Sequence, residues 1–160
     1  MKIKTPLKYF VAISIVFLIN TTASAQLCSN FHKTTGCASK ASGQGFQPYG
    51  QSKSGMLEIN KPFEYKLVLY GNRDHVFVLC TEAGYYPIHY RIINAQTKEV
   101  IYDNEEDDYI ESVGFTNDYT QTVILEITIL AKKVDPEDAY DARACVGINI
   151  LWRKVPKIGF

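Results

Sequence analysis

Apolar and polar residues alternate along most of the chain after residue 55. The clearest case is segment 63–70. Phe63, Tyr65, Leu67 and Leu69 point one way, and Glu64, Lys66 and Val68 point the other. A period of two is typical of a β-strand that buries one face. The same pattern, interrupted by turn residues, predicts further strands at 56–60, 75–80, 88–93, 99–102, 109–115, 120–130 and 144–152.

Segment 75–80 differs because it is apolar on both faces, which predicts a central strand. The residues 71–74 (GNRD) favour a tight turn, so 63–80 is predicted to be a hairpin. No amphipathic helix of ordinary length and no internal repeat interrupts the series. We therefore predict an all-β fold, an antiparallel, jelly-roll-like β-sandwich of seven or eight strands.

The N-terminus has the pattern of a secretory signal peptide. Three lysines precede an apolar run at 9–19, and an Ala-x-Ala motif ends at Ala25, which predicts cleavage after residues 1–25. The run is shorter than the roughly 20 residues that a spanning helix needs, so a membrane anchor is disfavoured. Lipidation of Cys28 would require a small residue before it, whereas Leu27 stands there. The predicted location is secreted or periplasmic.

The mature chain is predicted to have one domain. Residues 26–55 form a disulfide-containing loop segment rich in Gly, Ser, Gln and Thr, 56–152 the β-sandwich, and 153–160 a basic tail. Removing three lysines from 17 basic residues, against 17 acidic ones, leaves a net charge of −3. This charge excludes the basic surface of a nucleic-acid-binding protein, and no second apolar segment predicts membrane insertion after cleavage.

Four cysteines remain after cleavage: Cys28, Cys37, Cys80 and Cys145. An even number in an exported chain predicts two disulfides, and sequence alone allows three pairings. We expect Cys28–Cys37, which closes a small loop in the polar segment, and Cys80–Cys145, which joins the ends of two strands. A zinc site is disfavoured because no C-x-x-C pair is present.

Two loops carry candidate binding residues. The acidic run at 103–108 offers hard oxygen ligands of the kind that calcium prefers, although it lacks the glycine and spacing of an EF-hand; the candidates are Asp103, Asn104, Glu105, Asp107 and Asp108. A solvated turn explains the same residues. Tyr85 and Tyr86 stand together in a second loop, and exposed tyrosines bind proteins and stack on sugar rings. Their alternative is a structural role at a sheet edge.

No motif predicts catalysis or a cofactor. The three histidines, His32, His75 and His89, are scattered, and no H-E-x-x-H sequence is present. The segment GQSKSG at 50–55 places Ser52 and Ser54 near glycines but lacks the G-x-S-x-G spacing and the following helix of a nucleophile elbow. We therefore expect a protein that is not an enzyme.

The segments GMLEINKPFEYKLVLYGNRDHVFVLC, EVIYDNEEDD, QTVILEITIL and CVGINILW together resemble the small β-sandwiches related to bacterial pre-peptidase C-terminal domains, over residues 55–152. With its early cysteine pair and its closing strand that begins with CVG, the chain also resembles small stand-alone secreted proteins of Gram-negative bacteria that lack an assigned function. The resemblance implies an extracytoplasmic accessory module, sometimes with calcium and without catalysis of its own. We predict a non-catalytic exported module that binds a protein or a surface component. The alternative is a carbohydrate-binding module, either with or without a requirement for calcium.

Overall fold

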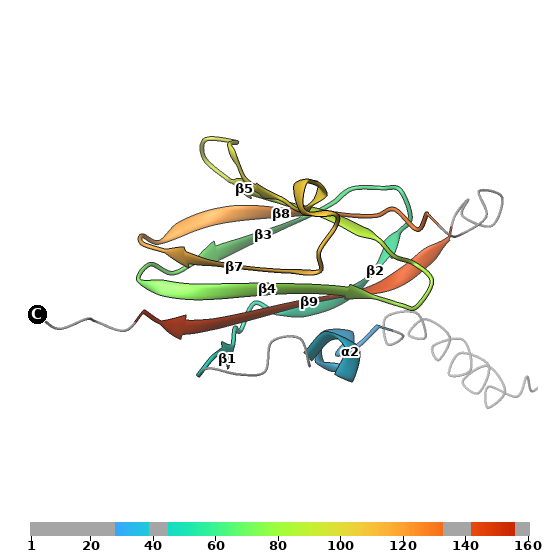
Figure 1. Ribbon diagram of the computed structural model, residues 1–160, viewed down its shortest axis with the longest axis horizontal. Helices are drawn as coiled ribbons and strands as arrows, with labels where there is room; N and C mark the ends of the chain where they lie inside the picture. The colour runs from blue at the N-terminus through green and yellow to red at the C-terminus, as the bar shows by residue number, and fades with distance from the viewer. Residues whose placement is uncertain (1–27, 39–44, 133–141, 156–160) are drawn as a thin grey trace, which may run out of the picture.

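Two antiparallel β-sheets packed face to face make up most of the residues that the computed structural model describes, namely 28–38, 45–132 and 142–155 (Figure 1). One sheet has five strands: β1 (Gln47–Pro48) and β2 (Lys53–Glu58) both pair with β9 (Arg143–Lys154), followed by β4 (Arg73–Thr81) and β7 (Ser112–Asn117). The other has the order β3 (Phe63–Leu69), β8 (Gln121–Ile129), β5 (Ile88–Asn94) and β6 (Val100–Asp103). The predicted antiparallel β-sandwich is confirmed, with nine strands among the described residues.

The core lies between the sheets and follows the predicted alternation. β3 directs Leu67 and Leu69 inward, and both are buried while Glu64 and Lys66 are exposed. The inward positions of β5, β8 and β9 are equally buried: Ile88, Tyr90, Ile92, Val123, Leu125, Ile127, Ile129, Val146, Ile148 and Ile150. Burial of these apolar side chains is the main stabilising contribution to the fold.

The predicted hairpin at 63–80 is wrong, because β3 and β4 belong to different sheets. β3 pairs with β8, whereas β4 lies between β9 and β7. β4 is apolar on both faces, so it takes a central position with a strand on each side. β3 has one apolar face, which packs against the core from the opposite sheet. The chain therefore crosses between sheets at 70–72, and it crosses again at 118–120 between β7 and β8.

The expected disulfide pairing is also wrong. The bonds are Cys28–Cys145 and Cys37–Cys80, with Cα–Cα distances of 5.3 and 5.5 Å. β4 and β9 are neighbours, but their register places Cys80 opposite Gly147, two residues beyond Cys145. Such diagonal positions are about 7–8 Å apart, beyond the usual reach of a disulfide. Each strand cysteine therefore bonds to the N-terminal segment that covers it.

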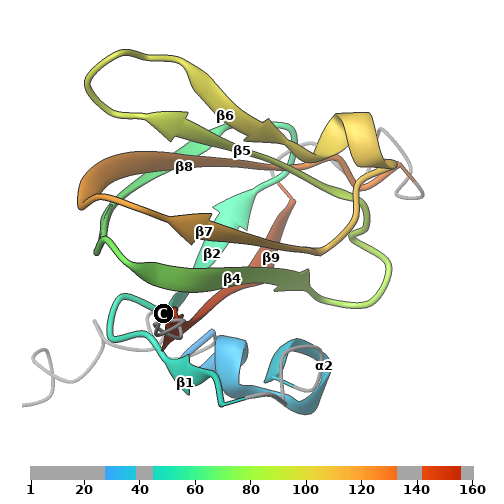
Figure 2. The ribbon, with the colours of Figure 1, turned by 60° about the vertical axis from the view of Figure 1, so that its left-hand side comes forward.

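That segment is not simply loop. It contains the 3-10 helix η1 (Phe31–Lys33) and the short helix α2 (Thr35–Ala38), and β2 begins at Lys53, inside the region predicted to be loop. Figure 2 shows α2 beneath the five-stranded sheet, on the face away from the core. A side chain at Gly147 would clash there, because an added Cβ lies 2.7 Å from Cys80 Sγ and 2.8 Å from His32 Cα. The segment is thus a third layer held by the two disulfides.

None of the described helices has the length and hydropathy that crossing a lipid bilayer requires. The predicted signal peptide, residues 1–25, and most of the predicted tail, 153–160, lie outside the described residues.

Candidate functional site

Two of the segments at which the chain crosses between sheets, 70–72 and 118–120, lie side by side at one end of the sandwich; we call these two the crossing loops. An added Cβ at Gly71 would lie 2.8 Å from the backbone carbonyl carbon of Tyr119, so only glycine allows this close approach. The Gly71 N–H donates to Thr120 Oγ1 at 3.1 Å. The two loops therefore form one continuous surface.

Asn117, at the end of β7, fixes both crossing loops from below. Its side chain is 2 % exposed, and its Nδ2 donates to the carbonyl oxygens of Leu69, Tyr70 and Tyr119 at 3.2, 3.3 and 2.6 Å. Its Oδ1 accepts from Gln121 Nε2 at 2.6 Å. A buried carboxamide with these contacts satisfies carbonyl groups of both crossing loops. This one amide therefore links the two loops.

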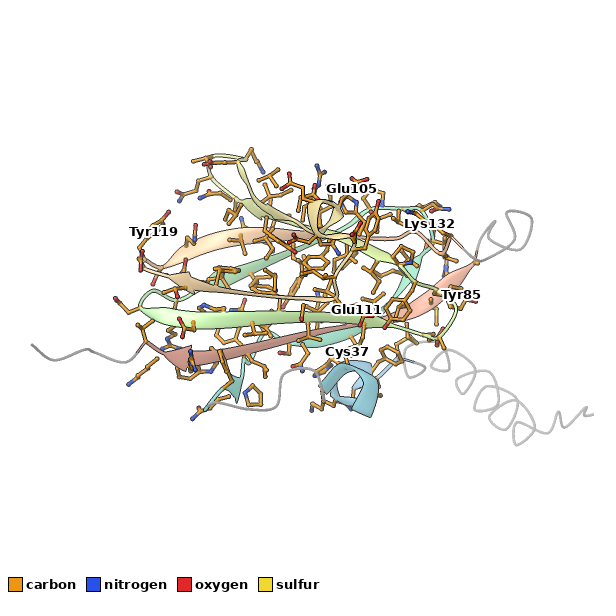
Figure 3. All side chains as sticks on the ribbon, viewed as in Figure 1. Cys37, Tyr85, Glu105, Glu111, Tyr119 and Lys132 are labelled. Atoms are coloured by element: carbon orange, nitrogen blue, oxygen red, sulfur yellow. A yellow bond between two sulfur atoms is a disulfide. The ribbon has the colours of Figure 1, made fainter. Side chains whose placement is uncertain are left out.

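Two large aromatic side chains project from the crossing loops. Tyr119 is 65 % exposed and Tyr70 is 48 % exposed, the two highest values among the exposed large hydrophobic residues of the described chain. Figure 3 shows Tyr119 at the outer end of the sandwich. Exposed tyrosines on a rigid support bring large contact area at small entropic cost, which is typical of binding surfaces.

Arg73 adds a positive charge beside these tyrosines. Its guanidinium lies 4.0 Å from the ring centroid of Trp152 and 5.1 Å from that of Tyr70. The nearby carboxylate of Asp74 is already engaged, because it accepts from Arg153 Nε at 2.8 Å and from Thr116 Oγ1 at 2.7 Å. The hydrogen bonds from Arg153 and then Thr116 hold the pKa of Asp74 below its usual value, although partial burial opposes them. Within the described chain Arg73 has no ion-pair partner.

The predicted tyrosine pair lies at the other end of the molecule (Figure 3). Tyr85 is half-buried and packs against the core cluster. Tyr86 is also half-buried, and its hydroxyl oxygen accepts the backbone N–H of Thr81 at 3.2 Å. Both side chains therefore hold the loop between β4 and β5 in place.

The five predicted calcium ligands do not all face the same point. The acidic run forms the 3-10 helix η3 (Asn104–Asp107), and Asn104 is buried: its Oδ1 accepts from Tyr90 N, and its Nδ2 donates to Ile88 O and Ile110 O. Asp107 accepts the hydroxyl of Tyr102 at 2.9 Å. Asp108 is exposed at the end of η3.

Asp103 and Glu105 instead face His89 on the outer side of β5. Asp103 Oδ1 lies 2.9 Å from His89 Nε2 and accepts the Glu105 N–H at 3.0 Å. Partial burial raises the pKa of the Asp103 carboxyl, but the hydrogen bonds from Glu105 N–H and His89 outweigh it, so the pKa lies below its usual value. One oxygen of each carboxylate and one ring nitrogen of His89 lie within 4.8 Å of one another. Calcium binding stays a prediction.

The other two histidines lie far from the acidic turn and make contacts that hold the fold. His75 is fully buried in the core against Tyr49 and Phe115, and burial, with Arg73 nearby, lowers its pKa. His32 bonds twice to Ser54: the backbone N–H donates to Oγ at 2.8 Å, and Nδ1 lies 2.7 Å from it. Ser54 therefore anchors η1 to β2.

Sequence reasoning missed the crossing loops. Their residues have the composition of ordinary turns, and nothing local indicates that two turns 48 residues apart share the amide of Asn117. The available signal was a pair of aromatic residues, Tyr70 and Tyr119, each next to turn residues.

Comparison with known proteins shows no family for this chain. No protein-family model and no curated protein matches the chain, so the resemblance to pre-peptidase domains stays a prediction. Among solved structures, the chain is similar to PliG of Aeromonas hydrophila, a periplasmic lysozyme inhibitor of g-type lysozyme. The identity is 9 %, the TM-score 0.46, and the match covers 69 % of this chain and 90 % of that chain. The function of this chain therefore has to be inferred from its own site.

Proposed function

We propose that this protein is a non-catalytic exported module that binds another protein through its crossing loops. The observation that carries the proposal is the exposure of Tyr70 and Tyr119 on two loops that one buried amide, Asn117, holds together. Binding of a partner would then immobilise few additional groups, so contact area converts efficiently into affinity.

The composition of the surface favours a protein partner. Tyrosine, tryptophan and arginine are the residues that contribute most to protein interfaces, and here the guanidinium of Arg73 lies over the rings of both Tyr70 and Trp152. The guanidinium of Arg73 is held by ring contacts and not by a carboxylate. It is therefore positioned to pair with an acidic group of the partner.

The experiment is site-specific photo-cross-linking. The mature protein carries a photoreactive phenylalanine analogue at position 119 and is irradiated in its native envelope and extracellular fractions. A matched control carries the analogue at Val100, which is 45 % exposed. Val100 belongs to β6 and lies outside the crossing loops. We expect a discrete adduct from position 119 that position 100 does not give and that Tyr70→Ser with Arg73→Gln removes. The same adducts from both positions, or no adduct, would refute the proposal.

A glycan array tests the carbohydrate-binding alternative with the same proteins. Binding that is lost in Tyr85→Ala with Tyr86→Ala would favour that alternative. Binding that is lost in Tyr70→Ala with Tyr119→Ala would keep the site and change its ligand class.

A further inference from the structure

A cavity of about 640 Å³ opens between the disulfide-anchored N-terminal segment and the outer face of β9. This volume lies within the range of small-molecule binding sites. Its apolar lining includes Ala38, Phe46, Tyr49 and Leu151, of which Tyr49 and Leu151 are buried. None of the lining residues belongs to the crossing loops, so a ligand in the cavity would occupy a second site, distinct from that of the proposed function.

Asn149 is the polar group at the floor of this cavity. Its side chain is only 8 % exposed, and its carboxamide makes no hydrogen bond to any other described residue. Among the described side chains only His75 and Tyr90 have fully buried polar atoms without a partner, so the carboxamide of Asn149 is accessible from the cavity. A carboxamide presents one acceptor and two donors in a plane, which is complementary to a second amide. The floor of the cavity is thus prepared for an amide-bearing ligand.

The ionisable side chains at the rim favour an anion. His32 and Lys33 line the cavity, and none of its described lining residues carries a carboxylate. Ser54 Oγ accepts the backbone N–H of His32 and lies 2.7 Å from Nδ1; when Oγ donates its proton to Nδ1, the ring carries its hydrogen on Nε2. Lys33 has no ion-pair partner in the described part of the chain. A ligand carboxylate at this rim can therefore contact the ammonium group of Lys33 and the imidazole of His32.

We propose that this cavity binds a small molecule that combines an apolar side chain, an amide and a free carboxylate. This is the chemistry of an N-acylated amino acid and of the last residue of a peptide. The apolar side chain packs against Phe46 and Leu151, the amide pairs with Asn149, and the carboxylate faces Lys33.

The test is a nuclear magnetic resonance titration of the isotopically labelled mature protein with both disulfides intact. The first probe is N-acetyl-L-phenylalanine. Two truncated probes accompany it: N-acetyl-L-phenylalanine amide, in which a primary amide replaces the carboxylate, and 3-phenylpropionate, which lacks the amide. An acetylated tetrapeptide that ends in phenylalanine distinguishes a peptide end from a free acyl amino acid. We expect saturable shifts at the cavity residues with a Kd of about 1 mM or below. Each truncated probe should bind at least about tenfold more weakly, because it lacks one of the recognised groups.

Variants separate recognition from folding. Asn149→Leu removes the unpartnered amide, so we expect an unchanged or raised thermal midpoint together with loss of binding. Asn149→Asp keeps the size of the side chain and should also abolish binding, by repulsion of the carboxylate. Lys33→Gln should weaken binding at least threefold, whereas Lys98→Gln, an exposed lysine in the turn between β5 and β6, should not. Absence of saturable shifts, or equal Kd values for wild type and a folded Asn149 variant, would overturn the proposal.

Discussion

Removal of either disulfide is expected to destabilise the protein by nearly the same amount, although the two bridges span very different lengths of chain. Cys37–Cys80 closes a loop of 43 residues and Cys28–Cys145 one of 117. A bridge acts mainly by lowering the entropy of the unfolded chain, and its contribution grows with the logarithm of the loop that it closes. The two bridges are nested, however, and this changes the relevant loop.

With Cys37–Cys80 intact, the unfolded chain already has a shortcut between Cys28 and Cys145. The shorter path runs over nine residues to Cys37, across the bridge, and over 65 residues from Cys80, about 74 in all. For loops of 43 and about 74 residues the chain-entropy relation gives about 4 and about 4.5 kcal/mol. Either loss is a large fraction of the roughly 5–15 kcal/mol of a typical domain.

The assay is urea unfolding of two variants, Cys37→Ala with Cys80→Ala and Cys28→Ala with Cys145→Ala. Alanine avoids placing a new hydroxyl in these buried positions. Both variants should lose about 4 kcal/mol, and non-reducing peptide mapping of the wild type should recover the two observed pairs. A loss below about 1 kcal/mol in either variant, or a difference above about 2 kcal/mol between them, would refute the nested-loop reasoning. A Cys28–Cys37 peptide would refute the pairing itself.

Three further predictions concern single residues. Asn117→Ala removes the amide that holds the crossing loops, so it should destabilise the fold by about 2 kcal/mol in urea unfolding. It should also weaken cross-linking from position 119. A loss of stability below about 0.5 kcal/mol would contradict the assigned role. Burial holds the pKa of His75 below its usual value, so the unfolded state binds the proton more readily and stability should fall as the pH drops from about 7 toward 5. His75→Phe should flatten that slope, and an unchanged slope would show that other groups cause it. If the acidic turn binds calcium, millimolar calcium should raise the thermal midpoint and Asp103→Asn should remove the rise; a midpoint insensitive to calcium and chelator rejects the site.

Local sequence determined the strands and their buried faces. The alternation at Leu67 and Leu69 and along β8 fixes which side chains face the core, because successive residues of a strand point to opposite sides and only one side carries apolar groups. It also identified β4 as central, since a strand apolar on both faces must be covered on both. The even cysteine number in an exported chain likewise predicted two disulfides.

Strand partners and disulfide partners were decided only by the tertiary structure. A turn of three residues such as 70–72 serves a hairpin or a crossing between sheets equally well, and the choice depends on β8 and β9, which lie far along the chain. The offset of two residues that separates Cys80 from Cys145 is likewise a property of strand register. The candidate site follows the same rule: Asn117, the tyrosines of the crossing loops and the unpartnered amide of Asn149 acquire their roles through contacts between distant segments, which no local pattern encodes.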